Sequence, residues 1–424
     1  MKITEIKSAI LGGQFDKDFA MLYGDIEYAK NRYAKACDSF CEIFPESEEI
    51  RLFTAPGRTE VGGNHTDHQH GSVLAGSVNL DVIAIVSLNN DGKIRIKSEG
   101  YDMDTVDITE FAKIDGEEGK AIALIRGVCS KFQELGYKIE GFNAYTTSNV
   151  LKGSGLSSSA AFEVLVGNII NNLFANGAVK AIDIAKIGQF AEREYFGKPC
   201  GLLDQMASSL GGFTYADFHN PADPITESIE LDIKSFGYTL CVVDTGGNHA
   251  NLTQDYADIT LECKAVSNAL GVDFLRDADI DEFYGKIAEL REKCGDRAVL
   301  RAFHFINEQQ RVLEQRAALK SKDFEGFLGL VNASGQSSYD YLQNLYSTSA
   351  VNEQGLSLAI ALTKKFLGGK GACRVHGGGF AGTIQCYIPT EMLESYKEMI
   401  EKAFGNGSCC VLNIRPVGGY ELKY

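Results

Sequence analysis

The sequence contains no tryptophan and no run of basic residues. Its 424 residues include 57 acidic and 41 basic side chains, which give a net charge of −16. Proteins that bind nucleic acid usually present a basic face to the phosphate backbone. We therefore expect no nucleic-acid partner. A small anionic ligand is still compatible with this charge, because one pocket can differ from the chain as a whole.

Cysteine pairs of the zinc-binding type are also missing. The eleven cysteines include no CxxC pair, and the nearest approaches are Cys37 with Cys41 and Cys409 with Cys410. These spacings do not suit a tetrahedral zinc site, so we interpret the cysteines as reduced thiols. The N-terminus has no apolar signal core, and no apolar run is long enough to span a membrane. We predict a cytoplasmic protein without a membrane partner.

Two common nucleotide-binding signatures are absent. The chain has no GxxxxGK[ST] loop and no GxGxxG turn that joins a strand to a helix. Any phosphate must therefore be bound by a different loop. The apolar content of 44% and the charged content of 23% are ordinary for a soluble globular protein. The length is sufficient for two domains.

Hydrophobic periodicity divides the chain into two parts. The first part mixes short strands with predicted helices at 14–44, 106–136, 158–174 and 182–196. From about residue 214 a buried strand and long charged helices follow. This pattern predicts an α+β protein of two lobes, residues 1–213 and 214–424, with the last strands able to return to the N-terminal lobe.

A glycine-serine loop runs without a break into an apolar helix at residues 151–163, LKGSGLSSSAAFE. Gly153 and Gly155 allow the backbone to approach an anion closely. The N–H groups and dipole of the helix start attract phosphate, and the hydroxyls of Ser157–Ser159 can cap the helix or bind a metal. The alternative interpretation is a linker or a simple helix cap, although linkers do not usually feed a helix directly.

Two carboxylates follow in the segment FAEREYFGKPCGLLDQ. Glu192 lies late in one predicted helix, and Asp204 lies near the start of the next. A carboxylate is a suitable base for a sugar hydroxyl, and a second one is a suitable ligand for Mg²⁺. Each residue alone is better explained as an exposed helix residue or a cap, so the assignment depends on the neighbouring motifs.

A dense polar cluster lies at residues 55–71, APGRTEVGGNHTDHQHG. Arg58, Asn64, His65 and Asp67 form a group able to hold a small polyol. Arg58 follows a Pro-Gly turn, where a fixed guanidinium can stabilise a transferring phosphoryl group and keep a nearby carboxylate ionised.

The same segment also suggests a metal site, because His65, Asp67, His68 and His70 are potential ligands. In a strand, His65 and Asp67 would share a face that the other two do not. A metal-dependent hydrolase is therefore a weaker alternative, and it predicts activity without ATP that chelation abolishes.

These segments together resemble the GHMP small-molecule kinases and, within them, the galactokinase family. The family signatures are APGR with GEHTDY, GGGLSSSAS, AExxFxGxPCGxMDQ and GGGFGGC. Their counterparts here lie at 55–71, 153–161, 191–205 and 377–383. Tyr256 and the RAFH segment at 301–304 also match. The resemblance covers about residues 40–424 and implies an N-terminal S5-like α/β lobe, a C-terminal ferredoxin-like lobe, and ATP between them.

The resemblance also implies roles for individual residues. It implies ATP- and Mg²⁺-dependent phosphorylation of a sugar at the C1 hydroxyl, with Asp204 as the base and Arg58 as its partner. Ser159 and Glu192 are the implied Mg²⁺ ligands. The implied ATP loop consists of Gly153, Ser154, Gly155, Leu156, Ser157, Ser158 and Ser159. The implied sugar contacts are Asn64, His65, Asp67, Gly201 and Tyr256, and Gly377–Gly379 line the site from the second lobe.

Three positions depart from the family pattern. Asn64 replaces a glutamate that accepts a hydrogen bond from the sugar O6 hydroxyl, His68 replaces a tyrosine, and Gly335 replaces a histidine. An amide would tolerate a carboxylate at C6, so galacturonate is an alternative to galactose, and a sugar without C6 such as arabinose is a weaker one. This interpretation predicts that Asn64→Glu lowers turnover of galacturonate more than that of galactose. A non-catalytic sugar sensor is a further alternative, which the intact serine loop disfavours.

Overall fold

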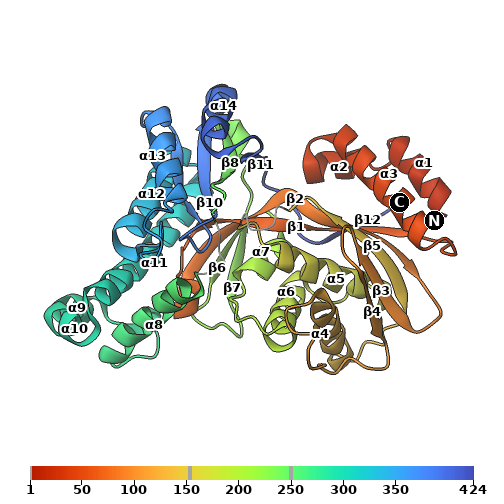
Figure 1. Cartoon of the computed structure of the whole chain (residues 1–424), viewed down its shortest axis with the longest axis horizontal. Coiled ribbons are helices and arrows are strands. Elements are labelled where there is room, and N and C mark those ends of the chain that lie inside the picture. Colours follow the sequence, from red (N-terminus) through yellow and green to blue (C-terminus); the bar gives the residue numbers. More distant parts are fainter. Residues whose placement is uncertain (1, 151–154, 248–251) are drawn as a thin grey trace.

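The structure, a computed structural model, describes residues 2–150, 155–247 and 252–424. Two separate β-sheets organise the chain, and each has its own helices (Figure 1). None of the helices in the described ranges is long and apolar enough to cross a membrane.

The first sheet has eight strands and is dominated by the long strand β2. Its main path runs β12-β1-β2-β5-β3-β4, and β6 and β7 continue from the other half of β2. Residues 82–88 of β2 pair with β5, whereas residues 72–76 pair with β6. The strands are β1 (Arg51–Gly62), β2 (Ser72–Leu88), β3 (Lys93–Ser98), β4 (Met103–Asp107), β5 (Phe142–Ser148), β6 (Phe213–Asp217), β7 (Ile225–Ile229) and β12 (Tyr420–Leu422).

Helices cover both faces of this sheet, because alternate residues of a strand point to opposite sides. Ile83 and Ile85 of β2 pack in one apolar cluster with the N-terminal helices. Ala84 and Val86 pack in the other cluster, which includes the middle helices. Figure 1 shows the two sets of helices on opposite sides of β1 and β2. The N-terminal helices are α1 (Ile3–Leu11), α2 (Asp16–Tyr23) and α3 (Ile26–Ile43), and the middle helices are α4 (Ala121–Glu134), α5 (Ser158–Phe174), α6 (Ala181–Phe190) and α7 (Leu203–Leu210).

The second sheet has four antiparallel strands in the order β11-β8-β10-β9. Its strands are β8 (Tyr238–Asp244), β9 (Ala372–His376), β10 (Thr383–Pro389) and β11 (Cys409–Leu412). The helices of this lobe are α8 (Thr253–Ala269), α9 (Ile280–Gly285), α10 (Ile287–Cys294), α11 (Asp296–Ser321), α12 (Phe324–Ser337), α13 (Gly355–Leu367) and α14 (Leu393–Phe404). The arrangement agrees with the predicted two-lobed α+β fold.

The crossing between the sheets differs from the boundary expected near residue 214. β6 and β7 still pair within the first sheet, and the chain enters the second sheet only at β8. The C-terminal strand β12 then pairs antiparallel with β1. The sequence pattern missed this because β6 pairs with the distant strand β2, and β7 pairs with β6.

Two predicted helices can be compared with the helices of the structure. The predicted helix at 158–174 coincides with α5. The predicted helix at 106–136 is wrong in its first half, because β4 extends to Asp107 and α4 begins only at Ala121. The intervening segment is rich in glycine and acidic residues, and Gly116 and Gly119 adopt positive φ angles that a helix does not use.

Candidate active site

The described part of the glycine-serine loop starts at Gly155 and leads into α5. Gly153 and Ser154, which the resemblance assigns to the ATP loop, lie outside the described residues. Gly155 (φ 70°) and Ser157 (φ 57°) have left-handed backbone conformations, and α5 follows directly. For a serine this conformation is unfavourable, and such residues concentrate at functional sites.

Hydrogen bonds join the glycine-serine loop to the start of the polar cluster. The backbone N–H of Arg58 donates to the Leu156 carbonyl at 3.0 Å, and the Arg58 guanidinium donates to the Gly155 carbonyl. A Cβ atom on Gly57 would lie 2.6 Å from the Leu156 carbonyl oxygen. Pro56 and Gly57 lie within β1, at an irregularity of its pairing with β2, rather than in a turn. Glycine at position 57 is required for this close approach, which brings the two motifs together.

Arg58 and Asp204 form the central ion pair of the site. The Nε and Nη2 atoms of Arg58 both lie 2.8 Å from Oδ1 of Asp204, and the Ser157 hydroxyl donates to Oδ2. Burial acts to raise the pKa of Asp204, but the Arg58 charge and the hydrogen bonds from Arg58 and Ser157 outweigh it and hold the pKa below 3.8. With 35% of its side chain exposed, the Asp204 carboxylate is accessible as well as ionised at neutral pH.

Ser159 and Glu192 lie next to each other, as the resemblance implies for a metal pair. The Ser159 hydroxyl donates to Oε1 of Glu192 at 3.2 Å. Lys198 donates to the same oxygen at 2.9 Å, and Gln205 donates to Oε2 at 2.7 Å. Glu192 stands in a π-helical turn, η2 (Ala191–Phe196), that ends α6. Such turns are frequent at functional sites.

This donor set fits Mg²⁺ better than a transition metal. Among the described residues, no group of three or more His, Cys, Asp and Glu side chains is placed to hold a metal ion. A hydroxyl and one carboxylate are hard oxygen donors, and Mg²⁺ usually completes its octahedron with substrate phosphates and water. Ser159 and Glu192 are therefore residues that could hold Mg²⁺ together with a nucleotide.

Asp67 of the polar cluster lies against Gly201, three residues before Asp204. A Cβ atom on Gly201 would lie 2.1 Å from Oδ2 of Asp67, so only glycine allows this approach. Burial raises the pKa of Asp67, and the nearby Asp204 carboxylate raises it further, although His65 acts in the opposite direction. The two segments predicted to contact a sugar are thus in direct contact.

The second lobe contributes the glycine turn at 377–379. Tyr256 donates to the Gly379 carbonyl at 2.9 Å, and Nε2 of His65 lies 2.8 Å from the Gly378 carbonyl oxygen. A Cβ atom on Gly378 would lie 2.5 Å from the Tyr256 ring. His65 itself has a left-handed backbone (φ 58°). These contacts place His65, Tyr256 and the glycine turn at one junction between the lobes.

The HTDHQH segment does not form a metal centre in the structure. It is a turn followed by the short 3₁₀ helix η1 (Asp67–Gln69) rather than a strand. His70 turns away and stacks on Phe274, with 3.5 Å between the ring centroids. Burial lowers the pKa of His68 to about 3, and both of its ring nitrogens are buried without a hydrogen-bond partner. The histidines therefore do not converge on one ion.

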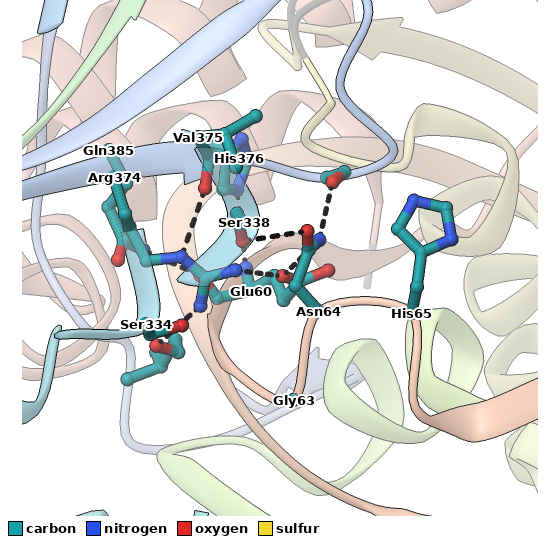
Figure 2. A network of polar contacts seen from close by, with 12 residues as sticks. Glu60, Gly63, Asn64, His65, Ser334, Ser338, Arg374, Val375, His376 and Gln385 are labelled. Carbon is teal, nitrogen blue, oxygen red and sulfur yellow. Dashed lines mark hydrogen bonds and ion pairs between the residues drawn. The ribbon is translucent and has the colours of Figure 1, made fainter. Parts of the chain in front are cut away.

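Asn64 does not lie on an exposed surface that a ligand could contact. Its side chain is fully buried, and it hydrogen-bonds to Glu60 and to the Gly377 carbonyl. Figure 2 shows it enclosed between the two lobes, with Arg374 on the other side of Glu60.

Several residues at the site were given no role by the sequence analysis. Gln205 bridges Glu192 and Glu163 through Nε2, at 2.7 and 2.9 Å. Glu308 of α11 accepts from the Gly63 backbone at 3.1 Å, and His304 of the same helix lies 3.0 Å from the Asn64 carbonyl oxygen. The RAFH match at 301–304 included His304, but no motif near Glu308 predicted its contact with the polar cluster.

A cavity of about 810 Å³ extends from the start of α5. Ser158 and Ser159 line one end of it, and the apolar side chains of Leu124, Phe162 and Phe196 line another part. Its size and mixed lining suit a small organic ligand. The cavity thus continues from the predicted phosphate loop.

Comparisons with known proteins agree with this geometry. The family model described as GHMP kinases N terminal domain matches residues 123–212, and the galactokinase galactose-binding signature matches residues 38–88. Galactokinase from Streptomyces coelicolor is 31% identical over 87% of this chain and 92% of its own length. Galactokinase from Glaesserella parasuis is 30% identical over 82% and 88%, respectively.

Solved structures with a similar fold include a galactokinase and a mevalonate kinase. The crystal structure of Lactococcus lactis galactokinase complexed with galactose matches with a TM-score of 0.76 at 24% identity, covering 90% of this chain and 98% of that one. The mevalonate kinase of Methanococcus jannaschii matches with a TM-score of 0.60 at 14% identity. By sequence, signature and fold, the chain belongs to the galactokinase family of GHMP kinases.

Proposed function

We propose that the chain is an ATP-dependent galactokinase, which phosphorylates galactose at the C1 hydroxyl to give galactose 1-phosphate and ADP. The observation that supports this most directly is the position of Asp204. Its Oδ2 contacts Ser157 of the phosphate loop, and its Oδ1 contacts Arg58. Gly201, three residues earlier, lies against Asp67 of the polar cluster. The base thus stands where a sugar and a nucleotide phosphate meet.

The chain's own residues supply positioning and electrostatics. Asp204 accepts the proton of the C1 hydroxyl as the sugar oxygen bonds to the γ-phosphorus and the bond to the ADP oxygen breaks. Arg58 keeps Asp204 ionised and faces the charge that spreads over the transferring phosphoryl. Held in this geometry, the reactants need little further reorganisation, and positioning with electrostatic stabilisation accounts for most of the rate in phosphoryl transfer.

Ser159 and Glu192 are the residues that would hold Mg²⁺. When bound, the ion neutralises charge on the phosphates. Lys198 now pairs with Glu192 Oε1, and 59% of its side chain is exposed, so it is free to move toward a phosphate. Gln205 holds the other oxygen of Glu192 and fixes the carboxylate's orientation.

The cavity beside α5 is the place that we propose for the nucleoside part of ATP. Ser158 and Ser159 at one end lie at the helix start, where phosphate is favoured. Leu124, Phe162 and Phe196 offer an apolar surface for a base. The eleven cysteines are free thiols, and this supports the cytoplasmic location that we propose.

The galacturonate alternative is not favoured. The Asn64 amide is not free to bind a C6 carboxylate, because the side chain is buried and hydrogen-bonded to protein atoms. The relatives described above are galactokinases. A sensor without activity is likewise disfavoured, because Asp204, Arg58 and Ser157 are assembled in a reactive arrangement.

The test is ADP release in a coupled assay with ATP, Mg²⁺ and one of four sugars: galactose, galacturonate, N-acetylgalactosamine and arabinose. We expect turnover on galactose to exceed that on each of the other three. A clear preference for galacturonate would contradict the proposed substrate. An absence of ADP release with every sugar, together with intact sugar binding by calorimetry, would favour the sensor.

A further inference from the structure

The two lobes are joined beneath the site by a buried ion pair. Arg374 of β9 donates through Nη2 to Oε1 of Glu60 on β1 at 2.6 Å. The Arg374 side chain is fully buried, and 7% of the Glu60 side chain is exposed. The other nitrogens of Arg374 donate to the carbonyls of Val61 and Val375 at 2.9 and 3.0 Å. Each of the three guanidinium nitrogens therefore already donates to an acceptor.

Asn64 extends this pair toward the glycine turn. Its Nδ2 donates to Glu60 Oε1 at 2.9 Å and to the Gly377 carbonyl at 2.7 Å. Its Oδ1 accepts from Asn344 at 2.9 Å and from Ser338 at 3.4 Å. Both partners of Nδ2 are acceptors, which fixes the orientation of the amide. All four hydrogen-bonding positions of the amide are used, as Figure 2 shows in part.

The charges at this junction are balanced. Glu308 is the other carboxylate near Arg374, and it has its own partner in Arg311. Two carboxylates thus face two guanidinium groups. An acid at position 64 would point at Glu60 Oε1 and the Gly377 carbonyl, both of which repel it. A buried charge without a partner is strongly unfavourable, so the junction holds one carboxylate at position 60 or 64, but not two.

This balance explains two departures from the family pattern together. The family signature has a glutamate at position 64, whereas this chain has an amide there, bonded to the Glu60 carboxylate. Gly335 of α12 replaces a histidine, and a Cβ atom on Gly335 would already lie 3.0 Å from the Arg374 Cβ. A larger side chain at 335 would need the space beside Arg374. Both departures therefore adjoin the same ion pair.

The junction also controls residues of the sugar site. His65 follows Asn64 directly and lies 2.8 Å from the Gly378 carbonyl oxygen through Nε2. Asn344, which holds the Asn64 Oδ1, also donates to Gly378 at 3.1 Å. His65 has a left-handed backbone (φ 58°), which persists only where the surroundings impose it. Displacing Asn64 would therefore move His65 relative to the glycine turn.

We infer that Glu60, Asn64 and Arg374 form a charge-coupled positioning unit that holds His65 against the glycine turn of the opposite lobe. In this unit Asn64 is a positioning residue, and it does not discriminate among sugars at C6. The acceptable residue at position 64 depends on the charge at position 60. This inference rests on the proposed function for its kinetic test, but the coupling itself is a property of the folded protein.

The test is a double-mutant cycle with isosteric changes. Asn64→Asp adds a carboxylate without changing shape, and Glu60→Gln removes one. We expect N64D alone to lower kcat/KM for galactose roughly 100-fold, and we expect the added E60Q change to restore about tenfold of that loss, within the range of direct couplings. If the two substitutions acted independently, the fold losses of N64D and E60Q would multiply in the double variant. A double variant no better than N64D would overturn the inference.

Two further measurements separate positioning from general damage. Glu421 pairs with Arg51 at the distal end of β1 at 2.6 Å, so E421Q is a matched control that should not rescue N64D. We also expect N64D to weaken galactose turnover and galacturonate inhibition by equal factors. A tenfold selective change for galacturonate would mean that position 64 contacts the sugar, as the sequence alone suggested.

Failure of the proposed function can be distinguished from failure of this inference. If the wild-type protein does not phosphorylate galactose, the proposed function fails. The same four proteins can then be compared by their urea midpoints, where E60Q should raise the midpoint of the N64D variant. Equal midpoints for N64D with and without E60Q would overturn the coupling independently of any activity.

Discussion

Oδ1 of Asp204 receives both the Nε and the Nη2 atoms of Arg58 at 2.8 Å. The pair joins the start of α7 to the strand that contains the polar cluster, and Ser157 binds the other carboxylate oxygen. A base needs to be ionised and accessible to its substrate. The contact with Arg58 keeps the Asp204 carboxylate ionised, and about a third of the side chain is exposed.

Asp204→Asn should abolish most of the turnover while the protein still folds. The amide cannot accept the C1 proton, so we expect kcat to fall by roughly 10² to 10⁴, the usual contribution of a general base. ATP binding, measured by calorimetry, should remain within a few-fold of wild type. Asp217→Asn is a matched control, because Asp217 is paired with Arg276 at 2.8 Å outside the site. Near-native turnover of D204N would contradict the assignment.

The pH profile should report the pKa of Asp204. Because that pKa is held below the ordinary value of an aspartate, the carboxylate stays ionised at neutral and mildly acidic pH, and kcat/KM should fall only in strongly acidic solution. Arg58→Gln removes the charge that lowers the pKa, so burial then dominates and the pKa rises. The acid limb of the residual activity should move to higher pH. An unchanged acid limb in R58Q would contradict this account of the pair.

Gly201→Ala should damage sugar binding selectively. The added Cβ would lie 2.1 Å from Oδ2 of Asp67, so the carboxylate must move. We expect the KM for galactose to rise by roughly tenfold, equivalent to about 1.4 kcal/mol, with little change in the KM for ATP. Gly329→Ala is the control, because a Cβ at that helical position meets no atom within 4 Å. Equal changes in both KM values would argue for general misfolding.

Changes at Glu192 and Lys198 should shift the Mg²⁺ requirement in opposite directions. Glu192→Gln removes a charged ligand and should raise the free Mg²⁺ needed for half-maximal rate by roughly tenfold or more. Lys198→Ala removes a cation 2.9 Å from the same oxygen, so it should lower that concentration. The measurement is a Mg²⁺ titration at saturating ATP and galactose. Identical shifts in both variants would exclude Glu192 as a ligand.

Asp81 should be a major contributor to stability. Its buried carboxylate receives Tyr23 and Arg32 from the N-terminal helices, Thr54 from β1 and Arg415 from the C-terminal segment. Asp81→Asn should lower the free energy of unfolding by about 3 to 5 kcal/mol, the cost of breaking a buried pair. Urea denaturation at neutral pH measures this.

The same variant predicts a pH dependence. Burial opposes ionisation of Asp81, but Arg32 and Arg415 lower its pKa below 3.8. A carboxylate with a lowered pKa stabilises the fold above its ordinary pKa, and the contribution is lost as the pH falls through the folded value. The difference between wild type and D81N should therefore shrink below about pH 3.8. Asp38→Asn, which removes an exposed pair with Lys7, should change stability by less than about 1 kcal/mol.

The local motifs predicted much of the site. The loop before α5 and the helix at 158–174 could be inferred because each depends on a short segment with strong chemical character. The pairing of Arg58 with Asp204 was predicted only through the family resemblance, because the two residues are far apart in the sequence. The metal-site interpretation of HTDHQH was excluded only in three dimensions, where His70 stacks on Phe274 and the segment forms a turn. Whether these side chains converge depends on the secondary structure of the segment. Four polar residues close together in the sequence do not show which secondary structure they adopt.

The sequence by itself determined the family, because its signatures are contiguous residues that can be identified without a fold. It also predicted the phosphate loop and the two carboxylates from the same segments. Only the tertiary structure decided what Asn64 does. Its partners Glu60, Gly377 and Asn344 are separated by up to several hundred residues along the chain, and a buried amide takes its role from the charges around it. The lobe crossing at β8 was decided in the same way, because strand pairing depends on a partner elsewhere in the chain.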